Sequence, residues 1–309
     1  MTTAVDTATR ARELRASGGL VFTAFLWGSM IAFTGHLLTA LDPMVIAAGR
    51  YAIAAPIVLL MAWRRERGVV APVPLPLWRT FLLGAVGMTG FAACYSYGIL
   101  WSDPITAAAI IAMTPVVSLI MQRLMVGVRT PWRLAPGIVM ATLGAVGVGL
   151  SRPHAAAGEM HGGEFLLILG AAMWTWYSLR AQSWLAGSGI SQLRLSGATM
   201  AAGALGLVVV LGLGVMLGVN HLPTTVPEPL ILGQMLWIGV LSTALAIPIW
   251  NAGVSVLGVG VASLFANLTP VLAVAMSVAL GAEPSLGQLI GGLVVIAGVV
   301  WVQVARLRP

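Results

Sequence analysis

Residues 259–280 read VGVASLFANLTPVLAVAMSVAL, and no charged side chain interrupts them. A run of about 20 apolar residues is long enough, as a helix, to cross the hydrocarbon core of a bilayer. Asn267 and Pro270 stand inside this run. An amide is costly against lipid, and a helix-interior proline frees a carbonyl group that neighbouring helices must satisfy. The stretch therefore predicts a membrane-spanning helix that is kinked at Pro270 and faces protein or water at Asn267.

The rest of the chain has the same apolar character. Of its 309 residues, 59% are hydrophobic and only 8% are charged. A soluble domain carries about 25% charged residues, so too few polar side chains remain here to cover a surface in water. Disordered chains are excluded as well, because they combine low hydrophobicity with high charge. Membrane barrel strands alternate in polarity over about ten residues, which these runs do not. We therefore expect an all-α integral membrane protein.

Pro, Gly, Asp and Arg residues divide the chain into ten apolar runs. These predicted transmembrane helices cover residues 19–40, 44–63, 78–101, 104–126, 132–150, 163–186, 192–218, 229–256, 259–280 and 286–304. All sixteen basic residues are arginines, and fourteen of them fall on one side of this arrangement. The positive-inside rule places that side, with both termini, in the cytoplasm. The net charge of +7 thus reflects topology and attraction to anionic lipid, and we expect no nucleic-acid partner.

Shifting the chain by 155 residues aligns its two halves. Thr114–Val116 then meets Thr269–Val271, and Gly84 meets Gly239. Chance matching between apolar sequences is the alternative explanation. A five-span unit that is repeated in sequence must reverse its direction, which gives the inverted repeat found in many transporters. We expect two inverted five-helix repeats around a central cavity. The first repeat covers residues 19–150 and the second covers residues 163–304. The remaining segments are a cytoplasmic N-terminal segment (1–18), an extracytoplasmic linker (151–162) and a cytoplasmic tail (305–309).

These features resemble the EamA-type ten-helix carriers of the drug/metabolite transporter superfamily. The resemblance rests on Phe25–Gly28, on Pro43 and Arg50, on Tyr95, Gly98 and Asp103, on the two Thr-Pro pairs, and on the tail Gly281–Ser285 with Gln288, Gly291 and Gly298. One departure is Val128, which aligns with Glu283 where the family has a glutamate in the first half. Within the family the chain is most similar to aromatic amino-acid exporters of the YddG type. This resemblance implies export of amino acids, especially aromatic ones, across a bacterial cytoplasmic (inner) membrane.

Several polar and aromatic side chains lie in mid-span, where they could bind a substrate. The predicted binding residues are Trp27, Tyr95, Tyr97, Trp174, Tyr177, Trp250, Asn251 and Asn267. A belt of aromatic residues at the headgroups explains Trp27, Trp174 and Trp250 poorly, because each lies roughly seven or more residues from the ends of its span. A cavity lined by indoles and phenols would stack against an aromatic side chain. Core packing remains the alternative for the aromatics, and interhelical hydrogen bonding for the asparagines.

Three prolines and one arginine also lie inside predicted spans. Pro115, Pro248 and Pro270 are expected to kink their helices around the cavity and to assist gating, with a packing kink as the alternative. Arg50 stands about two turns inside the second span. It is expected to snorkel toward the interface or to pair with Asp42 or Asp103 on the same side, and contact with a substrate carboxylate is the alternative.

The sequence lacks the residue patterns that enzymes, metal sites and channels require. The four histidines are scattered, no Ser–His or Asp–Asp pair lies within the spans, and the single Cys94 cannot form an intramolecular disulfide. We therefore expect no enzyme activity, metal or cofactor, and no ring of charges suggests a channel.

All nine acidic residues lie outside span centres, which predicts facilitated diffusion driven by the substrate's own gradient. Proton or sodium coupling, and a different small amphiphilic metabolite or drug as substrate, remain open. The expected partners are a small-molecule substrate and the lipid bilayer; the oligomeric state stays open, a monomer included.

Overall fold

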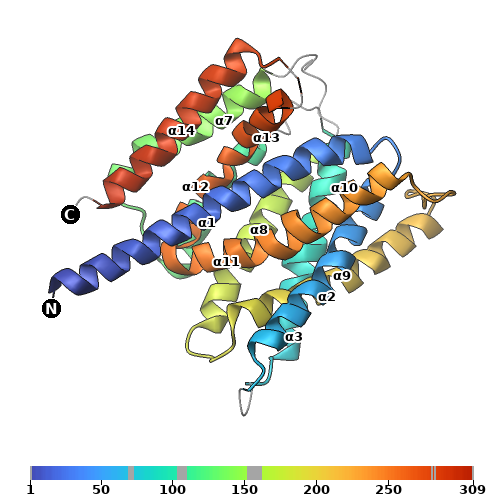
Figure 1. The fold of residues 1–309 in the computed structure, drawn as a ribbon, viewed down its shortest axis with the longest axis horizontal. Coiled ribbons are helices and arrows are strands. Elements are labelled where there is room, and N and C mark those ends of the chain that lie inside the picture. The colour runs from blue at the N-terminus through green and yellow to red at the C-terminus, as the bar shows by residue number, and fades with distance from the viewer. Residues whose placement is uncertain are drawn as a thin grey trace.

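The computed structural model describes residues 2–68, 73–102, 110–151, 162–279, 281 and 283–307 (Figure 1). Within these ranges every regular element is a helix, which confirms the predicted all-α class. Eight helices are long and apolar enough to cross a membrane, so the chain is a multi-pass membrane protein. They cover Thr9–Leu37, Pro43–Arg65, Leu77–Leu100, Trp132–Leu150, Gln192–Met216, Pro229–Leu257, Val259–Met276 and Leu286–Arg306.

Two further helices occupy the remaining predicted spans. Helix α6 (Thr114–Val126) is apolar but short, and residues 104–109 of the fourth predicted span lie outside the described residues. Helix α8 (Gly163–Leu185) matches the sixth predicted span. Its indole, phenol, hydroxyl and charged side chains make α8 less apolar than the eight helices above.

The helices follow one another with short connections. Their bounds are α1 (Thr2–Leu37), α2 (Pro43–Arg65), α3 (Leu77–Gly84), η1 (Ala85–Gly90), α4 (Phe91–Leu100), α6 (Thr114–Val126), η2 (Trp132–Leu134), α7 (Ala135–Leu150), α8 (Gly163–Leu185), α9 (Gln192–Met216), α10 (Pro229–Gly239), η3 (Val240–Leu245), α11 (Ala246–Leu257), α12 (Val259–Ala266), α13 (Leu268–Ala279) and α14 (Leu286–Leu307). Caps in the sequence set several ends. Asp42 accepts a hydrogen bond from Met44 N (2.8 Å) at the start of α2, and Gly127 ends α6 with a φ of 74°.

Two spans contain a π-helical turn at matching positions. Segment η1 joins α3 to α4, and η3 joins α10 to α11. Both segments have six residues, and they begin at Ala85 and Val240, 155 residues apart. Pro248 follows η3 as the third residue of α11, whereas the matching position after η1 is Ala93. The π turn therefore does not depend on the proline.

The two Thr-Pro sequences also lie at matching interruptions. Helix α6 begins at Thr114 after a turn at Met113, and α13 begins at Leu268 after a turn at Asn267. Pro115 and Pro270 thus lie in the first turn of a new helix, where a missing N–H removes no hydrogen bond. The bend expected at each proline takes the form of a break just before it.

Helices from the two halves of the chain pack against one another. Helix α7 lies along α14 at one edge of the molecule, and α2 lies along α9 at the opposite edge (Figure 1). Between them, α1 packs on α11 and α13, while α8 packs on α4 and α6. The largest apolar core cluster joins these inner helices and includes Tyr51, Met88, Tyr177, Met200 and Trp250.

Candidate functional site

Three tryptophans from separate helices meet in the middle of this core. Trp27 lies on α1, Trp174 on α8 and Trp250 on α11. The ring centroids are 5.9 Å apart for Trp27 and Trp174, 5.1 Å for Trp27 and Trp250, and 6.1 Å for Trp174 and Trp250. These separations lie within the range of favourable aromatic pairs. We call the three residues the indole cluster.

The indole cluster combines one satisfied and one unsatisfied N–H group. Trp27 Nε1 donates to the carbonyl oxygen of Ser242 in η3, at 3.2 Å. Trp250 Nε1 is buried and has no hydrogen-bond partner in the described part of the chain. A buried donor of this kind carries a desolvation cost that a water or a ligand acceptor would relieve.

Asn251 and Tyr177 link the indole cluster to α9. Asn251 Nδ2 donates to Tyr177 Oη at 2.8 Å and to Ser196 Oγ at 2.9 Å. The amide therefore joins α11 to α8 and α9, as the interhelical interpretation of Asn251 requires. Its Oδ1 atom is buried without a partner among the described residues, so one acceptor stays available for a ligand or water.

Asn267 lies at the break between α12 and α13. Its side chain is 3% exposed, and Nδ2 has no hydrogen-bond partner within the described ranges. The same holds for Oγ1 of Thr269, two residues further along. The interruption before Pro270 thus carries polar groups that the surrounding helices leave unsatisfied.

The two predicted tyrosines of α4 separate from each other. The ring centroids of Tyr95 and Phe91 lie 5.7 Å apart, and Phe91 in turn lies 5.1 Å from Trp174, so Tyr95 contacts the indole cluster through Phe91. Tyr97 instead stacks on Trp101 at 5.2 Å and donates to Asn220 Oδ1 at 2.7 Å. Sequence reasoning missed Phe91, although it stands one helical turn before Tyr95 and so shares its face.

Asp42 belongs to a network at the helix ends rather than to an ion pair with Arg50. Besides capping α2, its carboxylate accepts from Asn220 Nδ2 at 3.0 Å and from His221 N at 3.1 Å. The predicted pairing of Arg50 with Asp42 is therefore wrong; Asp103 lies outside the described residues. Eight residues separate Asp42 from Arg50, which is about 12 Å along a helix and beyond the reach of one side chain.

Arg50 is held by weak contacts inside the protein. Its guanidinium lies 4.7 Å from the ring centre of Tyr51, and Nη1 lies 3.3 Å from Met30 Sδ. Neither ion pair found in the described ranges includes Arg50, so its charge has no acidic partner there. An arginine of this kind can bind a carboxylate.

Glu164 and His36 both lie at helix ends rather than in mid-span. Glu164 is 4% exposed, more buried than its place at the start of α8 suggests, and its Oε2 accepts from Gly162 N at 3.0 Å. His36 Nδ1 lies 2.8 Å from Gln234 Oε1. Across the described residues no three His, Cys, Asp or Glu side chains gather as metal ligands.

The fold is similar to that of a solved structure, and the sequence is similar to several known transporters at low identity. A solved crystal structure superposes with a TM-score of 0.77 at 19% identity, covering 94% of this chain and 98% of the other. "Uncharacterized transporter YyaM" of Bacillus subtilis is 25% identical over 84% of this chain and 83% of its own length. The "Probable terminal-alkyne amino-acid exporter" of Streptantibioticus cattleyicolor is 26% identical over 92% of each chain.

The family comparison covers nearly the whole protein. The sequence profile of the EamA-like transporter family matches twice, over residues 16–150 and over residues 161–304. These two segments include all three residues of the indole cluster. The chain therefore belongs to the EamA-like transporter family.

Proposed function

We propose that this transporter carries amino acids, with aromatic ones preferred, and that it does so by alternating access between two inverted five-helix repeats. The observation that carries the proposal is the indole cluster, in which three helices converge beside buried polar atoms that have no hydrogen-bond partner among the described residues. Stacked indoles provide affinity for an aromatic side chain, worth about 0.5–1.5 kcal/mol per ring pair beyond burial. The unsatisfied donors and acceptors would bind the polar groups of the same molecule.

Matching contacts in the two halves support the repeat. The family profile matches two segments, and the π turns are 155 residues apart. A methyl group added at Gly144 would lie 2.7 Å from Gly291 O, and one added at Gly137 would lie 2.7 Å from Gly298 O. Gly137 aligns with Gly291, and Gly144 aligns with Gly298. A two-fold axis that exchanges the halves therefore converts the Gly144–Gly291 contact into the Gly298–Gly137 contact.

Arg50 is the residue we assign to the substrate carboxylate. Its guanidinium has no acidic partner in the described part of the chain, and its contacts with Tyr51 and Met30 are weak enough to be replaced. A carboxylate would form charge-assisted hydrogen bonds that neither neighbour supplies. One distant relative is named a probable amino-acid exporter, which agrees with such a substrate.

The proposal extends to membrane orientation and direction. The arginine distribution supports cytoplasmic termini, and the start of α1 and the end of α14 lie at the same end of the molecule (Figure 1). With ten crossings, residues 19–150 and 163–304 would form the two repeats. The proposed localisation in the bacterial inner membrane and the proposed direction, export, are both based on the family resemblance.

Transport by tryptophan variants tests the proposal. Purified protein in liposomes should take up phenylalanine or tryptophan saturably and release them unmodified, which separates a carrier from a channel or an enzyme. Trp174→Ala and Trp250→Ala should lower the transport efficiency for aromatic substrates roughly tenfold and that for alanine or valine much less. Trp132→Ala is the matched control, because Trp132 is 86% exposed. Equal losses for both substrate classes in folded protein, or no loss, would refute an aromatic-lined site.

A further inference from the structure

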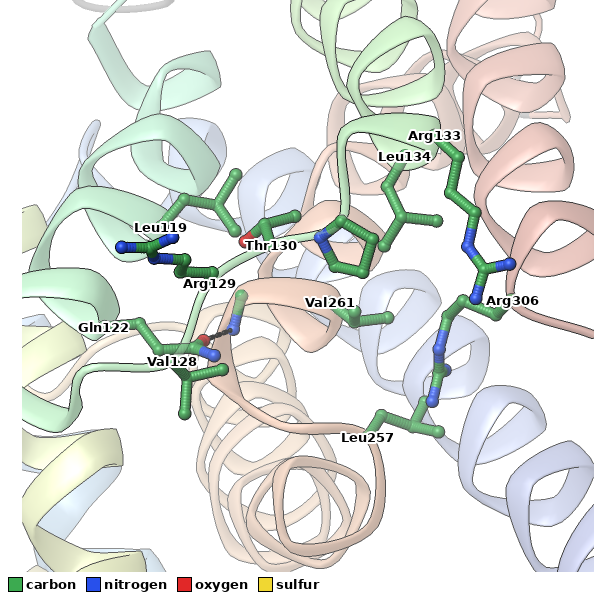
Figure 2. A pocket seen from close by; sticks show the side chains of 12 residues that line it. Leu119, Gln122, Val128, Arg129, Thr130, Arg133, Leu134, Leu257, Val261 and Arg306 are labelled. Atoms are coloured by element: carbon green, nitrogen blue, oxygen red, sulfur yellow. Dashed lines mark hydrogen bonds between the residues drawn. The ribbon is translucent and has the colours of Figure 1, made fainter. Parts of the chain in front are cut away.

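A hydrogen bond joins two inner helices near one end of the molecule. Gly260 N, on α12, donates to Gln122 Oε1, on α6, at 2.7 Å, and Figure 2 shows this bond as a dashed line. Gln122 belongs to the first half of the chain and Gly260 to the second. The bond lies where α6 ends and α12 begins, at the end of the bundle that the arginine distribution favours as cytoplasmic. We call this contact the Gln122 latch.

The Gln122 latch provides a helix cap that α12 does not supply itself. Helix α12 begins after Gly258, which has a φ of 80° and no side chain to cap the first turn. The N–H groups of a first turn have no partner within their own helix, and Gly260 N is one of them. The Gln122 amide satisfies this group from another helix. Water can take the place of the amide when the helices separate, so the bond can break without damage to either helix.

The glycine at position 260 brings the two helices close together. An added Cβ would lie 2.6 Å from Leu119 Cδ2 and 2.7 Å from Gln122 Oε1, so a larger residue would displace the amide. Leu119 also packs against an apolar cluster that contains Leu134 and Leu264. A cavity of about 250 Å³ borders the latch, and both Gln122 and Gly260 line it (Figure 2). The two helices therefore meet over a narrow contact at this point.

Both helices of the latch are bounded by interruptions of their spans. Helix α6 follows the turn at Met113 and ends at Gly127, which has a φ of 74°. Helix α12 follows Gly258 and ends at the break at Asn267. Residues at the ends of elements absorb the backbone rotation in hinge motions. Helices α6 and α12 can therefore move apart while the helices beyond the breaks keep their packing.

The sequence does not repeat the latch in its other half. The shift of 155 residues aligns Gln122 with Ser277 and Gly260 with Ile105, so neither the long amide nor the glycine has a counterpart. A perfectly symmetric inverted repeat would have inward-open and outward-open states of equal energy. A bond whose residues are present at one end only lowers the energy of the state that is closed at that end.

We propose that α6 and α12 form the cytoplasmic gate of this transporter, and that the Gln122 latch favours the conformation closed toward the cytoplasm. This inference rests on the alternating access proposed above. A hydrogen bond made in one of two conformations shifts their ratio by about fivefold. Gln122 is thus a positioning residue that acts on the helices.

Cysteine labelling measures the opening of this gate without any substrate. Ser118 is 1% exposed and lies one helical turn before Gln122, so Ser118→Cys, in protein that also carries Cys94→Ala, reports when this face of α6 becomes accessible. A membrane-impermeant thiol reagent is added to inside-out and to right-side-out vesicles. Gln122→Met, which has a similar length but no amide oxygen, should raise the labelling rate from the cytoplasmic face about fivefold. Gln122→Glu keeps an acceptor oxygen and should stay within about twofold of the parent.

Gln288→Met is the matched control for these variants. Gln288 Oε1 also accepts from a backbone N–H, that of Ser285 at 2.9 Å, but both residues lie at the start of α14 and their bond joins no second helix. Equal acceleration by this control, no acceleration in Gln122→Met, or acceleration only from the opposite face would overturn the proposal. If aromatic amino acids are not transported while labelling behaves as expected, the proposed substrate is wrong and the gate stands.

Discussion

Replacing Gly298 by alanine would place a methyl group inside the backbone contact between α7 and α14. An added Cβ would lie 2.5 Å from Ala141 N and 2.6 Å from Gly137 O. Ordinary van der Waals contact begins near 3.4 Å, so the two helices must separate by roughly 0.9 Å at this point. Both obstacles are main-chain atoms, which cannot rotate away as a flexible side chain could.

The expected loss follows from two opposing terms. Overpacking a tight interior costs about 1–3 kcal/mol, and contact with backbone belongs in the upper part of that range. Alanine stabilises a helix relative to glycine by up to about 1 kcal/mol. The net loss of unfolding free energy is therefore about 2 kcal/mol. At 2–4 °C per kcal/mol, the melting temperature should fall by about 4–8 °C.

The single cysteine provides the assay. Cys94 is half-buried on α4 and becomes fully accessible when the protein unfolds. Labelling with a thiol-reactive dye during heating in detergent then reports the melting temperature. Gly212→Ala is the matched control, since a methyl group there meets nothing within 4 Å and should leave the protein equally or slightly more stable. If Gly298→Ala melts together with this control, the helices do not approach as closely as we describe.

Three further predictions concern mechanism and stability. Alanine at Pro115 and Pro270 restores N–H groups and lets each helix continue through its break, so turnover should fall more than substrate affinity; wild-type turnover in the double variant would contradict a gating role. Asp42→Ala removes the α2 cap and a partner of Asn220 and should cost about 1–3 kcal/mol in thermal unfolding, whereas Asp42→Asn, which keeps a capping oxygen, should cost less. In liposomes at clamped membrane potential, an imposed pH or sodium gradient should not drive substrate above equilibrium, because the buried Glu164 lies in the first turn of α8 rather than at a span centre; accumulation would refute facilitated diffusion.

Sequence reasoning located helices well because length and composition constrain them directly. The second predicted span, residues 44–63, corresponds to α2 at Pro43–Arg65, and the seventh, 192–218, corresponds to α9 at Gln192–Met216. Hydrocarbon thickness sets the number of apolar residues, and caps such as Asp42 and Ser191 mark where helices begin. The break before Pro270 was visible only as a kink, because proline tolerates either a bend or a new first turn.

The partners of individual side chains followed less directly from the sequence. Mid-span position singled out Trp27, Trp174 and Trp250, whose rings are in contact in the structure. The same reasoning included Tyr97, which contacts Asn220 instead. A position on the same side of the membrane suggested Asp42 as a partner for Arg50, yet Asp42 accepts a hydrogen bond from Asn220, 178 residues away. The two tyrosines of α4 differ by about 200° around the helix, and only packed neighbours decide what each face meets.

The sequence by itself determined that this protein is a helical membrane protein with two similar halves, because apolar run length and repeated glycine and proline positions are local properties. Tertiary structure alone decided the indole cluster and the π turns. Each of these depends on how one helix is rotated and how deeply it is inserted against another. Trp27 and Ser242, for example, are joined by a hydrogen bond across 215 residues. Such rotations are set by close packing among all helices at once, and no single segment contains that information.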